Sequence, residues 1–249
     1  AVLTLALGIG ATTAIFSVVY AVFEPMPYPK PDQLVMVWSS GRGSRNSVPS
    51  GDFLEWQRQN TTFASVAAYR TVSYNLTGDG NPQRLLAGRV SIGLFKLLGA
   101  QPVLGRDFLA KEDQPGREKV VIVSEGLWAR RFGSDANILG KALKLDGEDF
   151  AVIGVMPAAF RLPDQREREL WTPIAFKDNE RALYQARYID AIGRLKPEAS
   201  LAQAQSEMTT IAARLAQEHP DANAGWTITV KPLLGFVVGD VKTVVWVLF

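Results

Sequence analysis

The sequence lacks cysteine and has a single histidine, His219, among its 249 residues. The absence of cysteine excludes disulfides, cysteine nucleophiles and thiolate metal sites, and one imidazole excludes metal sites built from several histidines. A Ser-His-Asp triad would depend on His219. The net charge is only +2 and no block of basic residues is present, which argues against nucleic-acid binding. The sequence has no P-loop, so we expect the chain to bind no nucleotide through one. It also has no Gly-x-Ser-x-Gly elbow of an α/β-hydrolase. We expect no cofactor.

Charge is absent from residues 1–23. A helix of that length spans the roughly 30 Å hydrocarbon core of a bilayer, so we expect a transmembrane helix over 1–24. A buried core helix and a cleaved signal peptide are the alternatives. A second apolar run begins at Thr243, and we expect 243–249 to start a second membrane helix. On this interpretation the chain is a fragment cut inside two hydrophobic segments.

Between these runs, the patterns predict two strand–helix–strand units. Ser50 is the expected N-cap of the first helix, and Phe63, Val66 and Ala67 are expected to continue its apolar face. Ser200 and Gln203 form a capping box for the second helix. The expected strands are residues 34–39 and 70–76 around the first helix, and 188–195 and 226–230 around the second.

Two such units can share one sheet in a split-βαβ, ferredoxin-like arrangement, which makes the fold class α+β. A mixed, β-rich insert is expected between them. It contains a hairpin around Asp146-Gly147, a pair typical of a type I′ turn. The charge run over 165–169 is expected to be a solvated loop.

Candidate catalytic groups are few. Asp52 with Glu55 is expected on the solvent side of a helix start, where acids suit the helix dipole, and Asp146 lies with other acids at a hairpin tip. His219 is expected as a cation at a helix C-terminus, with no visible nucleophile beside it. Five tryptophans are interpreted mostly as core residues: Trp38, Trp56, Trp128, Trp171 and Trp226. We therefore predict no catalytic, cofactor-binding or metal-binding residue.

Short motifs occur in a fixed order along almost the whole chain. They are Pro27-Tyr28-Pro29-x-Pro31-Asp32, Asp52-Phe53-Leu54-x-Trp56, Leu98-Gly99-x-x-Pro102-x-Leu104-Gly105-Arg106, Val123-Ser124-x-Gly126-Leu127-Trp128, Leu145-Asp146-Gly147, Val152-Ile153-Gly154-Val155-Met156-Pro157, Trp171-x-Pro173, Arg194-Leu195-Lys196-Pro197 and Val238-Gly239-Asp240-Val241. This ordered set resembles permease subunits of the MacB/FtsX-like ABC transporter family.

The resemblance implies a MacB-like periplasmic core domain over residues 25–242, with porter-like parts at about 32–76 and 165–235 and an insert at about 77–164. It implies a bacterial inner-membrane permease, with this domain outside the cytoplasm, that serves efflux or drives a partner. The implied partners are an ABC ATPase, the rest of the permease or a second copy, the membrane and a periplasmic protein. No enzymatic activity is expected in this chain, since the family places ATP hydrolysis on the ATPase.

Two other classes of protein remain open. One is a single-span extracytoplasmic binding or sensor protein, and the other is a membrane-anchored hydrolase that uses His219.

Overall fold

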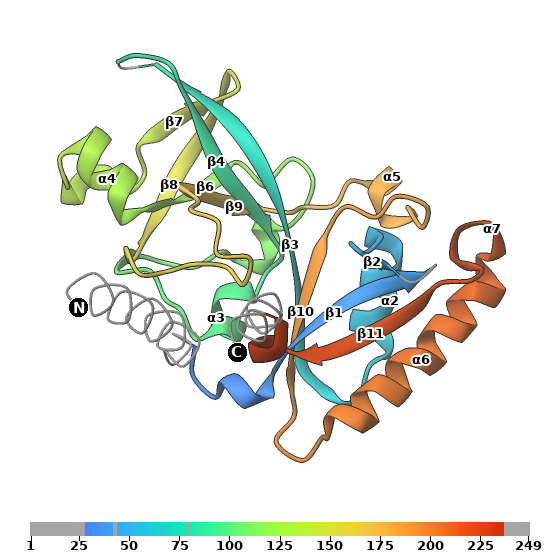
Figure 1. Cartoon of the computed structure of the whole chain (residues 1–249). Coiled ribbons are helices and arrows are strands. Elements are labelled where there is room, and N and C mark those ends of the chain that lie inside the picture. The colour runs from blue at the N-terminus through green and yellow to red at the C-terminus, as the bar shows by residue number, and fades with distance from the viewer. Residues whose placement is uncertain (1–27, 42–43, 79, 237–249) are drawn as a thin grey trace, which may run out of the picture.

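The structure is a computed structural model that describes residues 28–41, 44–78 and 80–236 (Figure 1). The predicted membrane segments at 1–24 and 243–249 lie outside the described residues. Within the described ranges, no helix is long and apolar enough to cross a membrane.

The first lobe is built from both ends of the described chain (Figure 1). Its elements are η1 (Pro31–Gln33), β1 (Leu34–Gly41), β2 (Ser44–Asn46), α2 (Ser50–Gln59), α5 (Asp178–Arg181), β10 (Asp190–Leu195), α6 (Leu201–Glu218), α7 (Pro220–Asn223) and β11 (Thr227–Pro232). The strand β3 (Phe63–Thr77) begins in this lobe and continues into the other.

The second lobe is built from the middle of the chain. Its elements are β4 (Gln83–Val90), α3 (Leu94–Leu98), β5 (Leu104–Gly105), η2 (Ala110–Glu112), β6 (Val120–Ser124), α4 (Glu125–Phe132), η3 (Ala136–Ile138), β7 (Ala142–Leu145), β8 (Glu148–Met156) and β9 (Leu170–Pro173). The predicted hairpin joins β7 to β8, and Asp146 and Gly147 both have positive φ (50° and 86°), as a type I′ turn requires.

One continuous sheet runs through the two lobes in the order β11-β1-β10-β3-β4-β9-β6-β8-β5. Its first four strands are antiparallel neighbours, with β1 between β11 and β10. The units β1-α2-β3 and β10-α6-β11 are therefore interleaved in one sheet, which is the predicted split-βαβ arrangement. The second lobe mixes parallel and antiparallel pairs.

The strand β3 contradicts one prediction. Phe63, Val66 and Ala67 do not continue the helix α2, because β3 begins at Phe63 and has 15 residues. Its first half pairs with β10 and its second half with β4, and Tyr69 lies opposite both Asp190 and Val90. Asn60 ends the helix in an extended conformation, and sheet pairing decides the conformation of the apolar residues that follow.

The core consists of three hydrophobic clusters, and the second of them joins the lobes. The helices α2 and α6 cover one face of the first-lobe strands, through side chains such as Phe53, Trp56 and Met208. The opposite face packs against α3 and aromatic side chains of the second lobe, including Phe95 and Trp171. A third cluster fills the interior of the second lobe. The lobes therefore share a buried contact as well as a strand.

Two local predictions are corrected by tertiary contacts. Ser50 is not the N-cap of α2: Pro49 occupies that position, and the Ser50 hydroxyl donates to the Glu180 carbonyl at 2.5 Å. Residues 165–169 are not uniformly solvated, because the Arg168 side chain is only 1% exposed. Its guanidinium donates twice to the carboxylate of Asp164 and once to the Thr71 hydroxyl. These partners offset the cost of burying the charge.

Candidate functional site at the strap

Residues 28–33, which we call the strap, lead into β1 and contact both lobes. The buried Tyr28 hydroxyl donates to the Arg161 carbonyl of the second lobe at 3.0 Å. Burial raises the pKa of Tyr28 to about 12, so this donor keeps its proton even above pH 10, where an ordinary tyrosine ionises. Pro31 opens η1 with the fixed φ that suits the first position of a helix.

Arg194, on β10, binds the strap and α3 together. Its Nε and Nη2 atoms donate to the Leu97 carbonyl at 3.0 and 2.8 Å. The same guanidinium donates to the carbonyls of Pro29 (2.9 Å) and Lys30 (3.1 Å). Burial lowers the pKa of Arg194, and the nearby charge of Asp32 acts in the opposite direction. Arg194 therefore fastens the strap to one strand of the first lobe and one helix of the second.

Gly99 provides the close approach that this junction needs. It ends α3 with a φ of +70°, and a Cβ built on it would lie 2.1 Å from Cγ of Pro29. Any other residue at this position would therefore push the strap away from α3.

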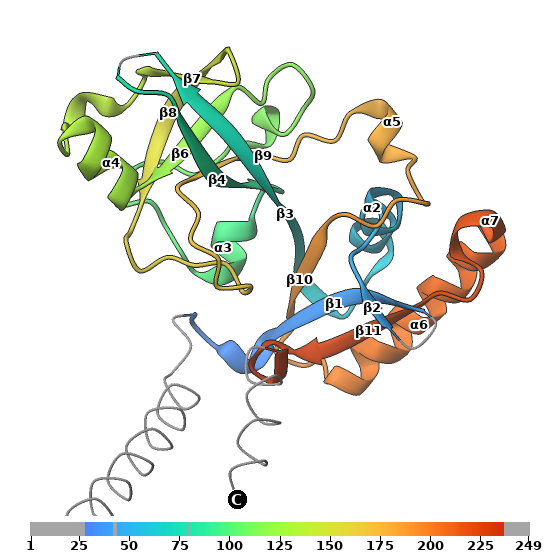
Figure 2. The same cartoon turned by 45° about the horizontal axis from the view of Figure 1, so that its top comes forward.

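The described chain leaves the domain beside the strap. Strand β11 is antiparallel to β1, and Pro232 at its end lies opposite Val35 at the start of β1. Leu233 is fully buried in the cluster that also contains Tyr28. Figure 2 shows the two ends of the described chain at the same end of the molecule. A force on the segment before β1 or on the segment after β11 would therefore act on one of two adjacent strands of the same sheet.

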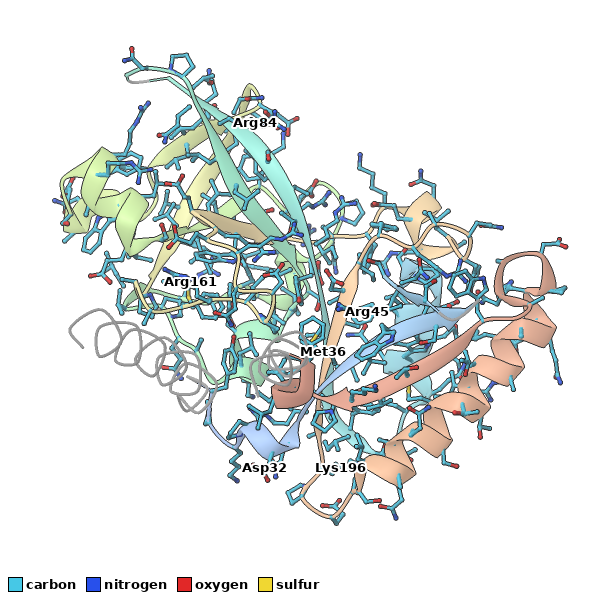
Figure 3. The ribbon with its side chains drawn as sticks, in the orientation of Figure 1. Asp32, Met36, Arg45, Arg84, Arg161 and Lys196 are labelled. Carbon is cyan, nitrogen blue, oxygen red and sulfur yellow. The ribbon has the colours of Figure 1, made fainter. Side chains whose placement is uncertain are left out.

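A cation–π contact holds the departing segment. The Phe236 ring lies 6.3 Å from the Trp38 ring, and the Arg45 guanidinium lies 4.2 Å and 5.2 Å from their respective centroids. Arg45 also forms an ion pair of 3.8 Å with Asp190 of β10. Figure 3 shows Arg45 in the first lobe, well separated from Arg161 in the second lobe.

The residues of the strap junction belong to the quoted motifs, but the sequence did not reveal their roles. Arg194 and Gly99 each lie within a motif that was noted for its order in the chain. The spatial link from Pro29 to both of them spans distances of 70 residues or more along the chain, so no local pattern predicts it.

His219 and Asp52, the two predicted groups of chemical interest, lie in one cluster near α7. The His219 ring stacks on Tyr184 with centroids 3.6 Å apart, and in the described part of the chain it makes no side-chain hydrogen bond. Asp52 is not on the solvent side of α2, because it is 6% exposed and accepts a hydrogen bond of 2.9 Å from Asn223. Within the described ranges, no hydrogen bond joins the His219 side chain to a nucleophile.

The environment of Asp52 changes its acidity. Burial raises its pKa to about 6, although the Asn223 hydrogen bond and the charges of Arg187 and His219 act in the opposite direction. Asp146 remains exposed at its hairpin tip and accepts hydrogen bonds from Asn75. A raised pKa is common at catalytic sites. The raised pKa of Asp52 has a structural cause, because α7, through Asn223, packs against the start of α2 and buries the carboxyl group.

The tryptophans differ in burial. Trp56 and Trp171 are 0% and 2% exposed, and Trp38, Trp128 and Trp226 are partly buried against protein. Trp226 carries the Arg187 guanidinium 3.6 Å from its ring centroid. Among the described residues, no group of three or more His, Asp or Glu side chains could hold a metal ion.

The sequence matches the family described as MacB-like periplasmic core domain over residues 1–211. The chain belongs to this family. It is therefore a MacB-like periplasmic domain of the ABC transporter permease class. No curated protein is significantly similar to it in sequence.

Solved structures of low sequence identity have the same fold. A domain of a putative permease from Porphyromonas gingivalis has a TM-score of 0.64 at 16% identity, with 82% of this chain and 91% of that chain covered. The periplasmic region of MacB from Actinobacillus actinomycetemcomitans has a TM-score of 0.62 at 17% identity, covering 91% and 98%. The extracellular domain of the noncanonic ABC-type transporter YknZ from Gram-positive bacteria has a TM-score of 0.51 at 16% identity. The match covers 79% of this chain and 99% of that chain.

Proposed function

We propose that this chain is the extracytoplasmic domain of a bacterial inner-membrane ABC permease and transmits ATP-driven motion of the membrane helices to a substrate or partner outside the cytoplasm. One observation carries the proposal: the chain enters through β1 and leaves through β11, which are adjacent strands of one sheet. Movement of the flanking segments relative to each other would therefore act directly on the sheet that both lobes share.

The strap makes such movement effective. It contacts the first lobe through Arg194. It contacts the second lobe through the hydrogen bond from Tyr28 to the Arg161 carbonyl and through the close approach of Pro29 to Gly99. A displacement of the strap changes both sets of contacts together. We expect the assembly to include an ABC ATPase, the rest of the permease or a second copy of the permease, and a periplasmic partner. Efflux is one function that such an assembly could perform.

Hydrogen exchange of the full-length permease with its ATPase tests this role. We expect ATP to change amide protection in the strap and in β10. Arg194→Gln should abolish that difference, because a neutral amide cannot bridge the strap carbonyls and α3. Arg84→Gln, at the β3–β4 hairpin, is the matched control that also removes one guanidinium (Figure 3). Identical protection with and without ATP in the wild type would contradict the coupling role.

We further propose that this domain catalyses no reaction, which the stacked position of His219 supports. His219→Ala should leave the transport and ATPase rates of the full assembly unchanged. A loss of a hydrolytic activity in this variant would favour the anchored-hydrolase alternative.

A further inference from the structure

A cavity of about 350 Å³ lies where the two lobes meet. Its walls come from α2, the β4–α3 turn, the segment after η2 and the linker between β9 and α5. Leu54, Ile92 and Phe176 form an apolar side, and Asp113, Gln114 and Arg181 form a polar side. The volume is near the lower limit of about 300 Å³ for small-molecule sites, so the cavity suits a ligand of few atoms.

Asp113 has one carboxylate oxygen that is poorly satisfied. Its Oδ1 accepts a hydrogen bond of 2.6 Å from the Ala175 backbone N–H, whereas Oδ2 has only a contact of 3.5 Å from the Ile92 N–H. Burial raises the pKa of Asp113, and these two N–H groups and the charges of Arg181 and Arg89 lower it. A half-buried carboxylate oxygen without a good donor favours a ligand that supplies one.

Arg181 places the opposite charge on the same cavity. It is the last residue of α5, its side chain is exposed, and it is near enough to influence the acidity of Asp113. The cavity thus presents a hydrogen-bond acceptor, a cation and an apolar wall together. A ligand that matches all three carries an ammonium group, a carboxylate and an apolar side chain.

We propose that this cavity binds a free α-amino acid with an apolar or aromatic side chain. The ammonium group donates to Oδ2 of Asp113, the carboxylate accepts from Arg181, and the side chain packs against Leu54, Ile92 and Phe176. Because the walls belong to both lobes, the bound amino acid contacts both and disfavours their separation. The binding itself does not depend on the proposed coupling role, although its effect on transport would.

Isothermal titration calorimetry of the full chain in detergent, without an ATPase, tests the site with L-phenylalanine as the probe. We expect saturable binding. N-acetyl-L-phenylalanine and L-phenylalaninamide, which lack the ammonium and the carboxylate, should each bind at least about tenfold more weakly, as loss of a charged hydrogen bond predicts. Arg181→Gln should weaken L-phenylalanine binding by about the same factor and leave that of the amide unchanged.

Gln114→Trp, which fills the cavity from an exposed position, should abolish binding without loss of folding, and Arg84→Gln should leave it unchanged. The proposal is overturned by absence of binding at millimolar L-phenylalanine, by equal binding of the three probes, or by binding that survives Gln114→Trp. If amide protection in the wild-type permease is the same with and without ATP, while the chain still binds L-phenylalanine, only the coupling role is contradicted.

Discussion

At the scale of single residues, the contacts of Arg194 depend on the planar shape of its guanidinium group, which holds several N–H donors in fixed directions. It donates five hydrogen bonds to four oxygen atoms on the strap and α3. Lysine has one nitrogen with three donors, so it could not reach these oxygens at once. The role of Arg194 could not be predicted from the sequence, because all four acceptors, three backbone carbonyls and the side-chain oxygen of Gln33, are distant along the chain.

Gly99→Ala should destabilise the domain by about 1–3 kcal/mol or more, since it combines a positive φ with a steric clash against Pro29. Gly116→Ala is the matched control, because Gly116 has a φ of +84° and open space around its Cβ position. Urea unfolding followed by tryptophan fluorescence compares the two variants. An equal loss of stability in both would show that contact with the strap has no energetic importance.

Asp52 makes stability dependent on pH in a defined direction. Its pKa is about 6 in the folded protein and 3.8 in the unfolded chain, so between these values the folded state binds more protons. Stability should therefore fall by about 2 kcal/mol as the pH rises from 4 to 7.

Asp52→Asn should remove this dependence, because the amide cannot ionise and can still accept from Asn223. Urea unfolding at several pH values measures the slope, and Asp146→Asn, at the exposed hairpin tip, is the control. An unchanged slope in Asp52→Asn would assign the pH dependence to other groups.

At the scale of elements, the outer edge of β11 is closed by a side chain. Gln205 of α6 donates to the Ile228 carbonyl at 2.8 Å and accepts from the Val230 N–H at 2.8 Å. The amide therefore pairs with β11 as another strand would. Unpaired edge strands promote association between chains, and proteins commonly protect them.

Gln205→Leu should expose this edge and produce concentration-dependent self-association, at a stability cost of about 1 kcal/mol for the lost hydrogen bonds. Sedimentation velocity of the full chain in detergent measures the association. Gln217→Leu, at an exposed position of the same helix, adds the same apolar surface without touching β11. Equal association of the two variants would attribute the effect to hydrophobicity rather than to the strand edge.

At the scale of the whole molecule, these 249 residues contain no cysteine, so a label can be attached to this domain at an introduced cysteine without competition from a thiol of its own. Spin labels at Arg84→Cys in the second lobe and Gln217→Cys in the first report the separation of the lobes. In the full permease with its ATPase, we expect ATP to change this distance. The pair Ser206→Cys and Gln217→Cys lies within α6 and should report no change. A constant distance between the lobes would mean that the domain moves as one rigid body.

The sequence by itself determined what depends on neighbouring residues and on the order of motifs. The capping box of Ser200 and Gln203, the type I′ turn at Asp146-Gly147 and the two interleaved βαβ units are all present. These features follow from local hydrogen bonds and hydrophobic periodicity, which are properties of short segments. The family was also identifiable, because the motifs occur in order over most of the chain.

Only the tertiary structure decided the features that depend on long-range contacts. Phe63, which was predicted to continue the apolar face of a helix, is the first residue of β3. Asp52 and Arg168 are buried in polar clusters. The tertiary structure also brought Pro29 against Gly99 and Arg194. The burial of a charge and the joining of distant segments depend on partners that folding supplies, and no local pattern in a sequence specifies them.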